Sequence, residues 1–240
     1  MSSVISLPGI EIEVDGSPLA PEDANALGSV RIQQRLSLPT QCELTFFDPE
    51  GPLAGAASMM PGSMLRVTLT GYRELLFVGQ VTAVDFDYGP SQGRQVHVRG
   101  YDLLHQLRKR QPVGTHIQVT LEELARSLVS DLGLRVEASE AGPLQQQLMQ
   151  YRQSDFELLS ELAQRCGLYF SLRDQVMYIL TLQGIGSPLE LELGSSLLEA
   201  RIDVNTDSAC KRIETTGWDP WRAETHTGHA DQARVGRQVQ

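Results

Sequence analysis

Residues 150–182 decide the fold, and they read QYRQSDFELLSELAQRCGLYFSLRDQVMYILTL. Ser154 is a favoured N-cap residue, and Glu157 at the third helical position completes a capping box. Gly167 predicts the end of this helix, because glycine enters the left-handed region at little cost. Between these two limits, apolar side chains recur at helical spacing: Phe156, Leu159, Leu162, Ala163 and Cys166.

The residues after Gly167 predict a tight hairpin. Leu168, Phe170 and Leu172 alternate with polar residues, 173–175 is a turn, and 176–180 returns. The same order of helix, glycine, leucine and strand occurs once before. There Thr120 and Glu123 form the capping box, Gly133 ends the helix and 134–136 is the strand. The two copies span 120–136 and 154–172.

The chain from residue 8 to residue 100 reads as β structure. Short alternating runs are separated by turn signals such as Asp15-Gly16 and Pro61-Gly62, which is typical of a sandwich or a barrel. Gly79 lies inside the long strand expected over 75–86, and a β-bulge is predicted there. A short helix is expected over 101–110, where the β character ends.

β structure is predicted again after a linker at 183–189. The expected strands are 189–193, 197–204 and 212–216. Residues 96–102 (VHVRGYD) and 213–219 (IETTGWD) share a pattern of strand, glycine, aromatic residue and aspartate. This echo between Gly100-Tyr101-Asp102 and Gly217-Trp218-Asp219 indicates a duplicated β domain.

Composition excludes several classes. The 240 residues carry a net charge of −10, which argues against specific binding to nucleic acid, because duplex DNA needs clustered Lys and Arg. The sequence has no run of 18 apolar residues, so no membrane span is predicted. The N-terminus lacks the basic and apolar regions of a secretory signal. Cys42, Cys166 and Cys210 are far apart, which favours free thiols. We therefore expect assembly in the cytoplasm without a signal peptide, with release by lysis or as part of a particle.

The candidate chemical sites are weak. His226 and His229 are three residues apart, but no further ligands accompany them, so a solvated loop is favoured over a metal site. Asp155 and Glu157 could form a carboxylate pair, yet acids in the first turn of a helix are usually stabilised by its dipole. Gly184-Ile185-Gly186 lacks the third glycine of a dinucleotide-binding loop. We predict no catalytic, cofactor-binding or metal-binding residue, and no cofactor.

The motifs resemble those of phage late control protein D and of VgrG-type baseplate hub proteins. Leu76–Asp85 is similar to the family's Phe-x-Gly-x-Val strand and places Gly79 in it. Gly100-Tyr101-Asp102 resembles the exit from the family's first barrel, and Gly217-Trp218-Asp219 resembles the exit from the second. The residues that match the signature of the family's helix are Gln153, Ser154, Asp155, Phe156 and Gly167.

The resemblance implies an α+β protein, mainly β, with two related antiparallel β-barrel tube domains and a helix-containing α/β domain between them. The expected domains are 1–100, 101–185 and 186–240, and the second barrel has fewer strands here than the family's pattern requires. It implies a homotrimeric hub of a contractile injection machine, such as a phage tail, a tailocin, an extracellular injection system or a type VI spike. Its partners would be a hexameric tail tube protein, a spike protein and other baseplate components.

Two other classes of function stay open at this point. A tail-associated cell-wall hydrolase would use paired acids such as Asp155 and Glu157. A carbohydrate- or receptor-binding β module would use Trp218 and Trp221 as stacking platforms.

Overall fold

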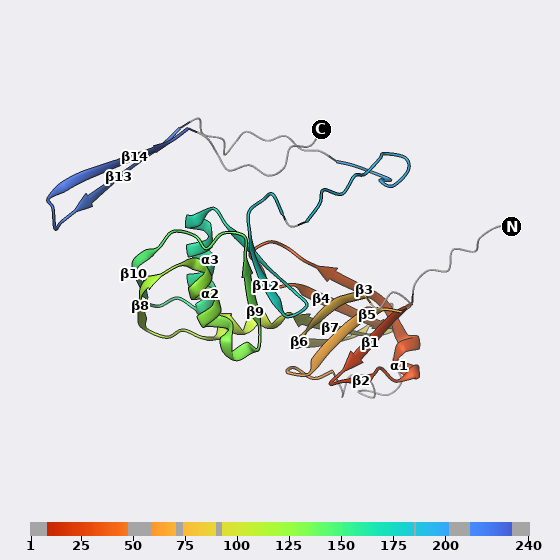
Figure 1. The fold of residues 1–240 in the computed structure, drawn as a ribbon. Helices are drawn as coiled ribbons and strands as arrows, with labels where there is room; N and C mark the ends of the chain where they lie inside the picture. The colour runs from red at the N-terminus through yellow and green to blue at the C-terminus, as the bar shows by residue number, and fades with distance from the viewer. Residues whose placement is uncertain are drawn as a thin grey trace. The chain divides into compact units, whose positions relative to one another are not determined.

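The computed structural model describes residues 9–47, 59–70, 74–89, 93–184, 186–201 and 212–231 (Figure 1). The described chain is α+β and mainly β, as the sequence predicts. It divides into two units, Met1–Thr181 and Leu182–Gln240, and each is a separate body.

The N-terminal part of the first unit is a seven-stranded antiparallel sheet in the order β2-β1-β5-β6-β7-β4-β3. Within the described residues no pairing joins β2 to β3, so the sheet is open at both edges. A short helix, α1 (Pro21–Ala26), lies between β2 and β3 in the chain and was not expected from the sequence. The strands are β1 (Ile10–Val14), β2 (Ser17–Pro18), β3 (Leu27–Gln33), β4 (Gln41–Phe47), β5 (Met64–Leu69), β6 (Glu74–Gly89) and β7 (Gly93–Tyr101).

One face of this sheet is buried because apolar residues alternate along its strands. β4 buries Cys42, Leu44 and Phe46, and β7 buries Val96 and Val98. Burial raises the pKa of the Cys42 thiol to about 12, so this thiol behaves as a small apolar side chain.

The bulge predicted at Gly79 is wrong, because Gly79 pairs regularly with Leu65 of β5. The register of β6 shifts instead at two other places: at Leu76, opposite β5, and between Val81 and Ala83, opposite β7. Gly79 is glycine for another reason: a Cβ atom there would lie 2.2 Å from the carbonyl oxygen of Tyr101.

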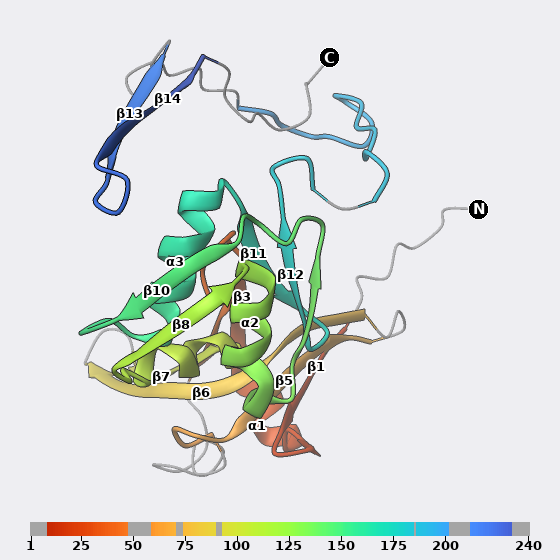
Figure 2. The same ribbon diagram turned by 60° about the vertical axis from the view of Figure 1, so that its left-hand side comes forward.

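The rest of the first unit is an α/β layer (Figure 2). Its three-stranded sheet has the order β11-β12-β9, with β12 antiparallel to β11 and parallel to β9, and a separate pair joins β10 to β8. The helices are η1 (Leu103–Lys109, a 3-10 helix), α2 (Leu121–Val129), η2 (Ser130–Leu132, a 3-10 helix) and α3 (Asp155–Cys166). The strands are β8 (Gly114–Val119), β9 (Arg135–Ala138), β10 (Gln145–Gln150), β11 (Tyr169–Arg173) and β12 (Val176–Leu180).

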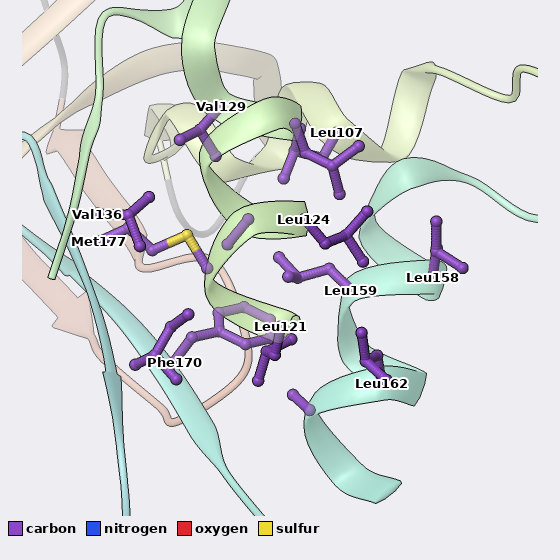
Figure 3. Packing of buried hydrophobic residues seen from close by; sticks show 14 of the residues in the cluster. Leu107, Leu121, Leu124, Val129, Val136, Leu158, Leu159, Leu162, Phe170 and Met177 are labelled. Atoms are coloured by element: carbon purple, nitrogen blue, oxygen red, sulfur yellow. The ribbon is translucent and has the colours of Figure 1, made fainter. Parts of the chain in front are cut away.

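The α/β layer has its own core, distinct from the core of the seven-stranded sheet. Figure 3 shows Leu124 of α2 and Leu159 of α3 between the helices, with Phe170 and Met177 of the neighbouring strands beside them. Leu124, Leu159 and Met177 have no exposed surface. This packing fixes α2 and α3 against the sheet.

The predicted starts of both helices and the end of α3 are confirmed, whereas α2 ends at Val129 and the 3-10 helix η2 continues to Leu132 before Gly133. Ser154 and Glu157 form the reciprocal capping box of α3, and Thr120 and Glu123 form that of α2. Gly167 ends α3 in the left-handed conformation, with φ 65°. Capping and termination are local interactions, which is why the sequence predicts them correctly.

The second unit contains one described hairpin, β13 (Ile213–Asp219) and β14 (Glu224–Ala230). The strand predicted at 212–216 is therefore confirmed and runs further. The strand predicted at 189–193 is wrong: among these residues only an isolated bridge joins Leu193 to Leu197, and Leu189 is 82% exposed. Of the strand predicted at 197–204, the described residues 197–201 belong to no strand, and residues 202–204 lie outside the described residues.

His226 and His229 lie in β14, and not in the solvated loop that the sequence favoured. Residues three apart on a strand point to opposite faces, so these two imidazoles do not converge.

Candidate assembly surfaces

Gly100, Tyr101 and Asp102 form the junction at which the seven-stranded sheet passes into the α/β layer. The Asp102 carboxylate accepts hydrogen bonds from the backbone N–H of Thr40 at 2.7 Å and of Leu104 at 3.0 Å. The second bond caps η1, and the backbone N–H of Asp102 donates to the Thr40 carbonyl at 3.0 Å. Asp102 is 3% exposed, so this side chain is buried where the seven-stranded sheet meets the α/β layer, and its hydrogen bonds link the two.

The environment of Asp102 shifts its protonation. Burial raises the pKa of this carboxyl to about 6, although the hydrogen bonds from Thr40 and Leu104 act to lower it. The neighbouring imidazole of His105 lies 2.7 Å from the Asp102 carbonyl oxygen through its Nδ1 atom. Burial lowers the pKa of His105, so its neutral form is favoured in the folded protein.

Asp102→Asn is expected to change the pH dependence of stability. The folded pKa lies above the unfolded value of about 4, so the folded protein binds more protons between these values and gains stability as pH falls. The Asn variant keeps an acceptor oxygen but lacks this gain. Its free energy of unfolding relative to wild type should be higher at pH 7.5 than at pH 4 by about 2 kcal/mol.

Urea denaturation at the two pH values measures this difference. His105 is present in both proteins, so its opposite contribution cancels in the comparison. A difference between variant and wild type that is the same at both pH values would contradict the burial of a titrating Asp102.

Arg108 connects the first motif to the helix signature. Its guanidinium lies 4.8 Å from the centroid of the Phe156 ring and 5.9 Å from that of Tyr101. The Phe156 ring in turn meets Phe170 edge to face, at 5.8 Å between centroids. Phe156 therefore packs between a cation and an aromatic ring, both of which favour its position.

Asp155 joins three elements at the start of α3. Its carboxylate accepts a hydrogen bond from the Gln150 side chain at 2.8 Å and lies 3.7 Å from Nε of Arg110. Its backbone N–H donates to the Arg110 carbonyl at 2.9 Å. The Gln153 side chain donates a hydrogen bond at 3.0 Å to the carboxylate of Glu161, a residue of α3. Gln153, Ser154 and Asp155 thus lie together as parts of one structural corner.

Glu157 serves the capping box. It accepts hydrogen bonds from the backbone N–H of Ser154 at 2.6 Å and from its hydroxyl at 2.8 Å, and these bonds lower the pKa of Glu157. Asp155 and Glu157 are therefore both engaged in bonds to neighbouring elements.

Gly217, Trp218 and Asp219 lie in the exposed hairpin of the second unit. The Asp219 carboxylate accepts a hydrogen bond from the backbone N–H of Trp221 at 2.9 Å, two residues further on. Asp102 makes the same bond to Leu104, also two residues further on. The wider surroundings differ, because a Cβ atom on Gly100 would meet the Gln80 carbonyl oxygen at 3.1 Å, whereas Gly217 has open space.

The outward face of the β8–β10 pair carries four exposed apolar side chains. Ile117 is opposite Gln147 in the register, and alternation along β10 places Met149 on the same face. Val113 precedes β8 and Tyr151 follows β10. These four side chains, called the β8–β10 face below, are between 61% and 77% exposed. Exposed apolar clusters of this kind are typical of protein–protein contact sites.

The outward face of the seven-stranded sheet is polar. Over β4, β6 and β7 it has a hollow of about 510 Å³. Here Arg99 lies 3.5 Å from Glu43, and His97 lies 3.4 Å from Asp87. This face is hydrophilic, in contrast to the β8–β10 face.

Within the part of the chain that the structure describes, no three His, Cys, Asp or Glu side chains gather closely enough to hold a metal ion. No helix among these residues has the length and apolar character needed to cross a bilayer.

Similar structures define the class of fold. A tail protein from Neisseria meningitidis MC58 matches 95% of this chain and 70% of its own, with a TM-score of 0.63 and 13% identity. A 43 kDa tail protein of prophage MuSo2 from Shewanella oneidensis matches 74% of this chain and 56% of its own, with a TM-score of 0.56 and 18% identity. The E. coli c3393 protein, a type VI secretion component, matches 70% of this chain and 48% of its own, with a TM-score of 0.50 and 14% identity.

This chain therefore has the fold of phage tail and type VI secretion proteins. It spans about half the length of the Shewanella and E. coli proteins. It belongs to the family described as the Alg8 N-terminal domain, whose model matches residues 5–238. No curated protein matches its sequence.

Sequence reasoning missed the β8–β10 face. Both strands lack the strong alternation of apolar residues that marks the other strands, and β10 begins with three glutamines. Ile117 and Met149, which are apolar residues beside polar ones in these two segments, are the sequence signal that could have identified it.

Proposed function

We propose that this chain is a structural component of the baseplate hub of a contractile injection machine, related to the late control protein D and VgrG-type hubs. In this proposal it forms a homotrimer that joins a hexameric tail tube to a trimeric spike, and it has no enzymatic activity. The role as a structural tail protein rests on the fold, and the role as a trimeric hub rests on the features described below.

The repeated motif is the observation that carries the hub role. Each copy is a strand that ends in glycine, an aromatic residue and an aspartate, and each aspartate accepts from the amide two residues further on. A chain with two related β units would present six such units when three chains assemble. A trimer could then match a sixfold tube on one side and a threefold spike on the other.

The hairpin β13–β14 supports assembly with other chains. A two-stranded hairpin is marginally stable by itself in water. Here Trp218 is 62% exposed and Trp221 is 95% exposed. Aromatic residues of this kind contribute strongly when a partner covers them, so a neighbouring copy is the proposed cover.

The two faces of the first unit suit different neighbours. The polar face over β4, β6 and β7 is suited to line a water-filled channel. The apolar β8–β10 face is suited to bind other baseplate components. The resemblance of the middle of the chain to the family's helical domain favours the same assignment.

The mass of the protein in solution, alone and with tube and spike proteins, tests the proposal. We expect a trimer, and we expect Trp218→Ala with Trp221→Ala to weaken self-association at least tenfold, because the buried aromatic contact is lost. Tyr151→Ala is the matched control: it removes an exposed aromatic side chain from the β8–β10 face and should leave the trimer intact.

A strict monomer that binds neither the tube nor the spike would contradict the hub role. Peptidoglycan turnover that Asp155→Asn abolishes in a folded protein would contradict the absence of enzymatic activity.

A further inference from the structure

A cleft of about 590 Å³ lies within the first unit, between the seven-stranded sheet and the α/β layer. One wall is the start of β6, Glu74–Val78. The lining also includes the turn between β11 and β12, residues 173–175, together with Leu134. Asp102 is also among the lining residues.

β6 is paired on one side only where it lines this cleft. Its residues from Glu74 to Gln80 pair with β5. Its pairing with β7 begins at Gln80, opposite Tyr101, and continues away from the cleft. After Tyr101 the chain turns into η1. Among the described residues, no strand lies opposite β6 between Glu74 and Gly79 on that side.

The direction of the backbone groups follows from the hydrogen bonds of Val81. Its N–H donates to the Ser63 carbonyl at 2.9 Å, and its carbonyl accepts from the Gly62 N–H at 2.8 Å, so both groups face the β5 side. Backbone groups alternate along an antiparallel strand, so those of Gly79 also face β5 and those of Val78 face the opposite side. The N–H and C=O of Val78 therefore point toward the cleft.

The charges that line the cleft favour a cation. Three carboxylates, those of Glu74, Asp102 and Asp174, accompany one guanidinium, that of Arg173. Glu74 and Asp174 are exposed. A positively charged side chain that entered the cleft would be attracted by both carboxylates.

We propose that this cleft binds an extended, positively charged segment of a partner protein, which adds as a strand to the free edge of β6 at Val78. Strand addition uses main-chain hydrogen bonds for affinity and flanking pockets for specificity. The cleft volume lies within the range of ordinary ligand sites, about 300 to 1,000 Å³. Lysine or arginine side chains of the segment would pair with Glu74 and Asp174.

The first experiment uses the full chain with two capped peptides of equal length, (Lys-Val)₃ and (Glu-Val)₃, in a calorimetric titration. We expect the lysine peptide to bind at least tenfold more tightly. Glu74→Lys combined with Asp174→Lys should remove or reverse this preference. The control is Glu137→Lys, which reverses the charge of an exposed residue of β9 outside the cleft. It should leave the preference for the lysine peptide unchanged.

The second experiment measures amide hydrogen exchange. The Val78 amide should exchange rapidly in the free protein and at least tenfold more slowly with the lysine peptide. The Gly79 amide faces β5 and should be protected in both states. Equal binding of the two peptides, or an exchange rate of Val78 that the lysine peptide does not change, would overturn the proposal.

Discussion

Gly79→Ala is expected to destabilise the protein by about 3 kcal/mol or more, the range of severe steric overpacking. The added Cβ would lie 2.2 Å from the Tyr101 carbonyl oxygen and 2.6 Å from Cζ of Phe77. The oxygen belongs to the backbone and has little freedom to move, because the next residue, Asp102, is bonded to Thr40 at 2.7 and 3.0 Å. Urea denaturation measures the loss of free energy.

Gly100→Ala is the matched control for this prediction. It makes the same chemical change in the adjacent strand, but the nearest atom to the new Cβ is the Gln80 carbonyl oxygen at 3.1 Å. A neighbour at this distance needs to move only slightly, so we expect a cost of about 1 kcal/mol. Equal losses for the two variants would show that Gly79 is not required by the close approach of Tyr101.

The Gly79 result illustrates where sequence reasoning succeeds and where it fails. The sequence marks Gly79 as a special position in a strand, but the atom that excludes a side chain belongs to Tyr101, 22 residues further along the chain. Tyr101 comes close to Gly79 because β6 pairs with β7, and such pairing between strands distant in the sequence leaves no local signature. The sequence predicts the need for glycine but assigns it the wrong cause, a bulge.

Helix α3 was predicted correctly because its signals are local. The N-cap, the capping box and the terminal glycine act within one turn of the residues that carry them. The contacts of Asp155 with Gln150 and Arg110 were not predictable from spacing alone, because these residues come from different elements. Asp155 reads as a simple helix-dipole residue in sequence, whereas in the structure it joins η1, β10 and α3.

The assembly surfaces also combine features that are visible in the sequence with features that only the folded chain shows. The echo between residues 96–102 and 213–219 is visible in sequence, and the shared aspartate-to-amide bond deepens it. The exposure of Trp218, and the direction of the Val78 backbone groups, depend on what packs nearby and emerge only in the folded chain. A β-barrel in the second unit stays a prediction, since the described residues of that unit contain one hairpin.

Phe156→Ala is expected to cost about 3 to 4 kcal/mol, as for other large-to-small changes in cores. The ring is 7% exposed, meets Phe170 edge to face at 5.8 Å, and lies 4.8 Å from the Arg108 guanidinium. Truncation would leave a cavity beside Phe170 and would remove the aromatic partner of a cation. Thermal and urea denaturation should both register the loss.

Two further variants divide this effect into its parts. Phe156→Leu retains most of the apolar volume but removes the aromatic ring. The free energy of unfolding should therefore fall by about 1 to 2 kcal/mol, because the contacts with Phe170 and Arg108 are lost. Ser154→Ala removes only the cap of the same helix and should cost about 1 kcal/mol. If Phe156→Ala cost no more than Ser154→Ala, the ring would not be the residue that holds α3 to the sheet. The link from the family-like helix signature through Arg108 to Tyr101 would then have no energetic basis.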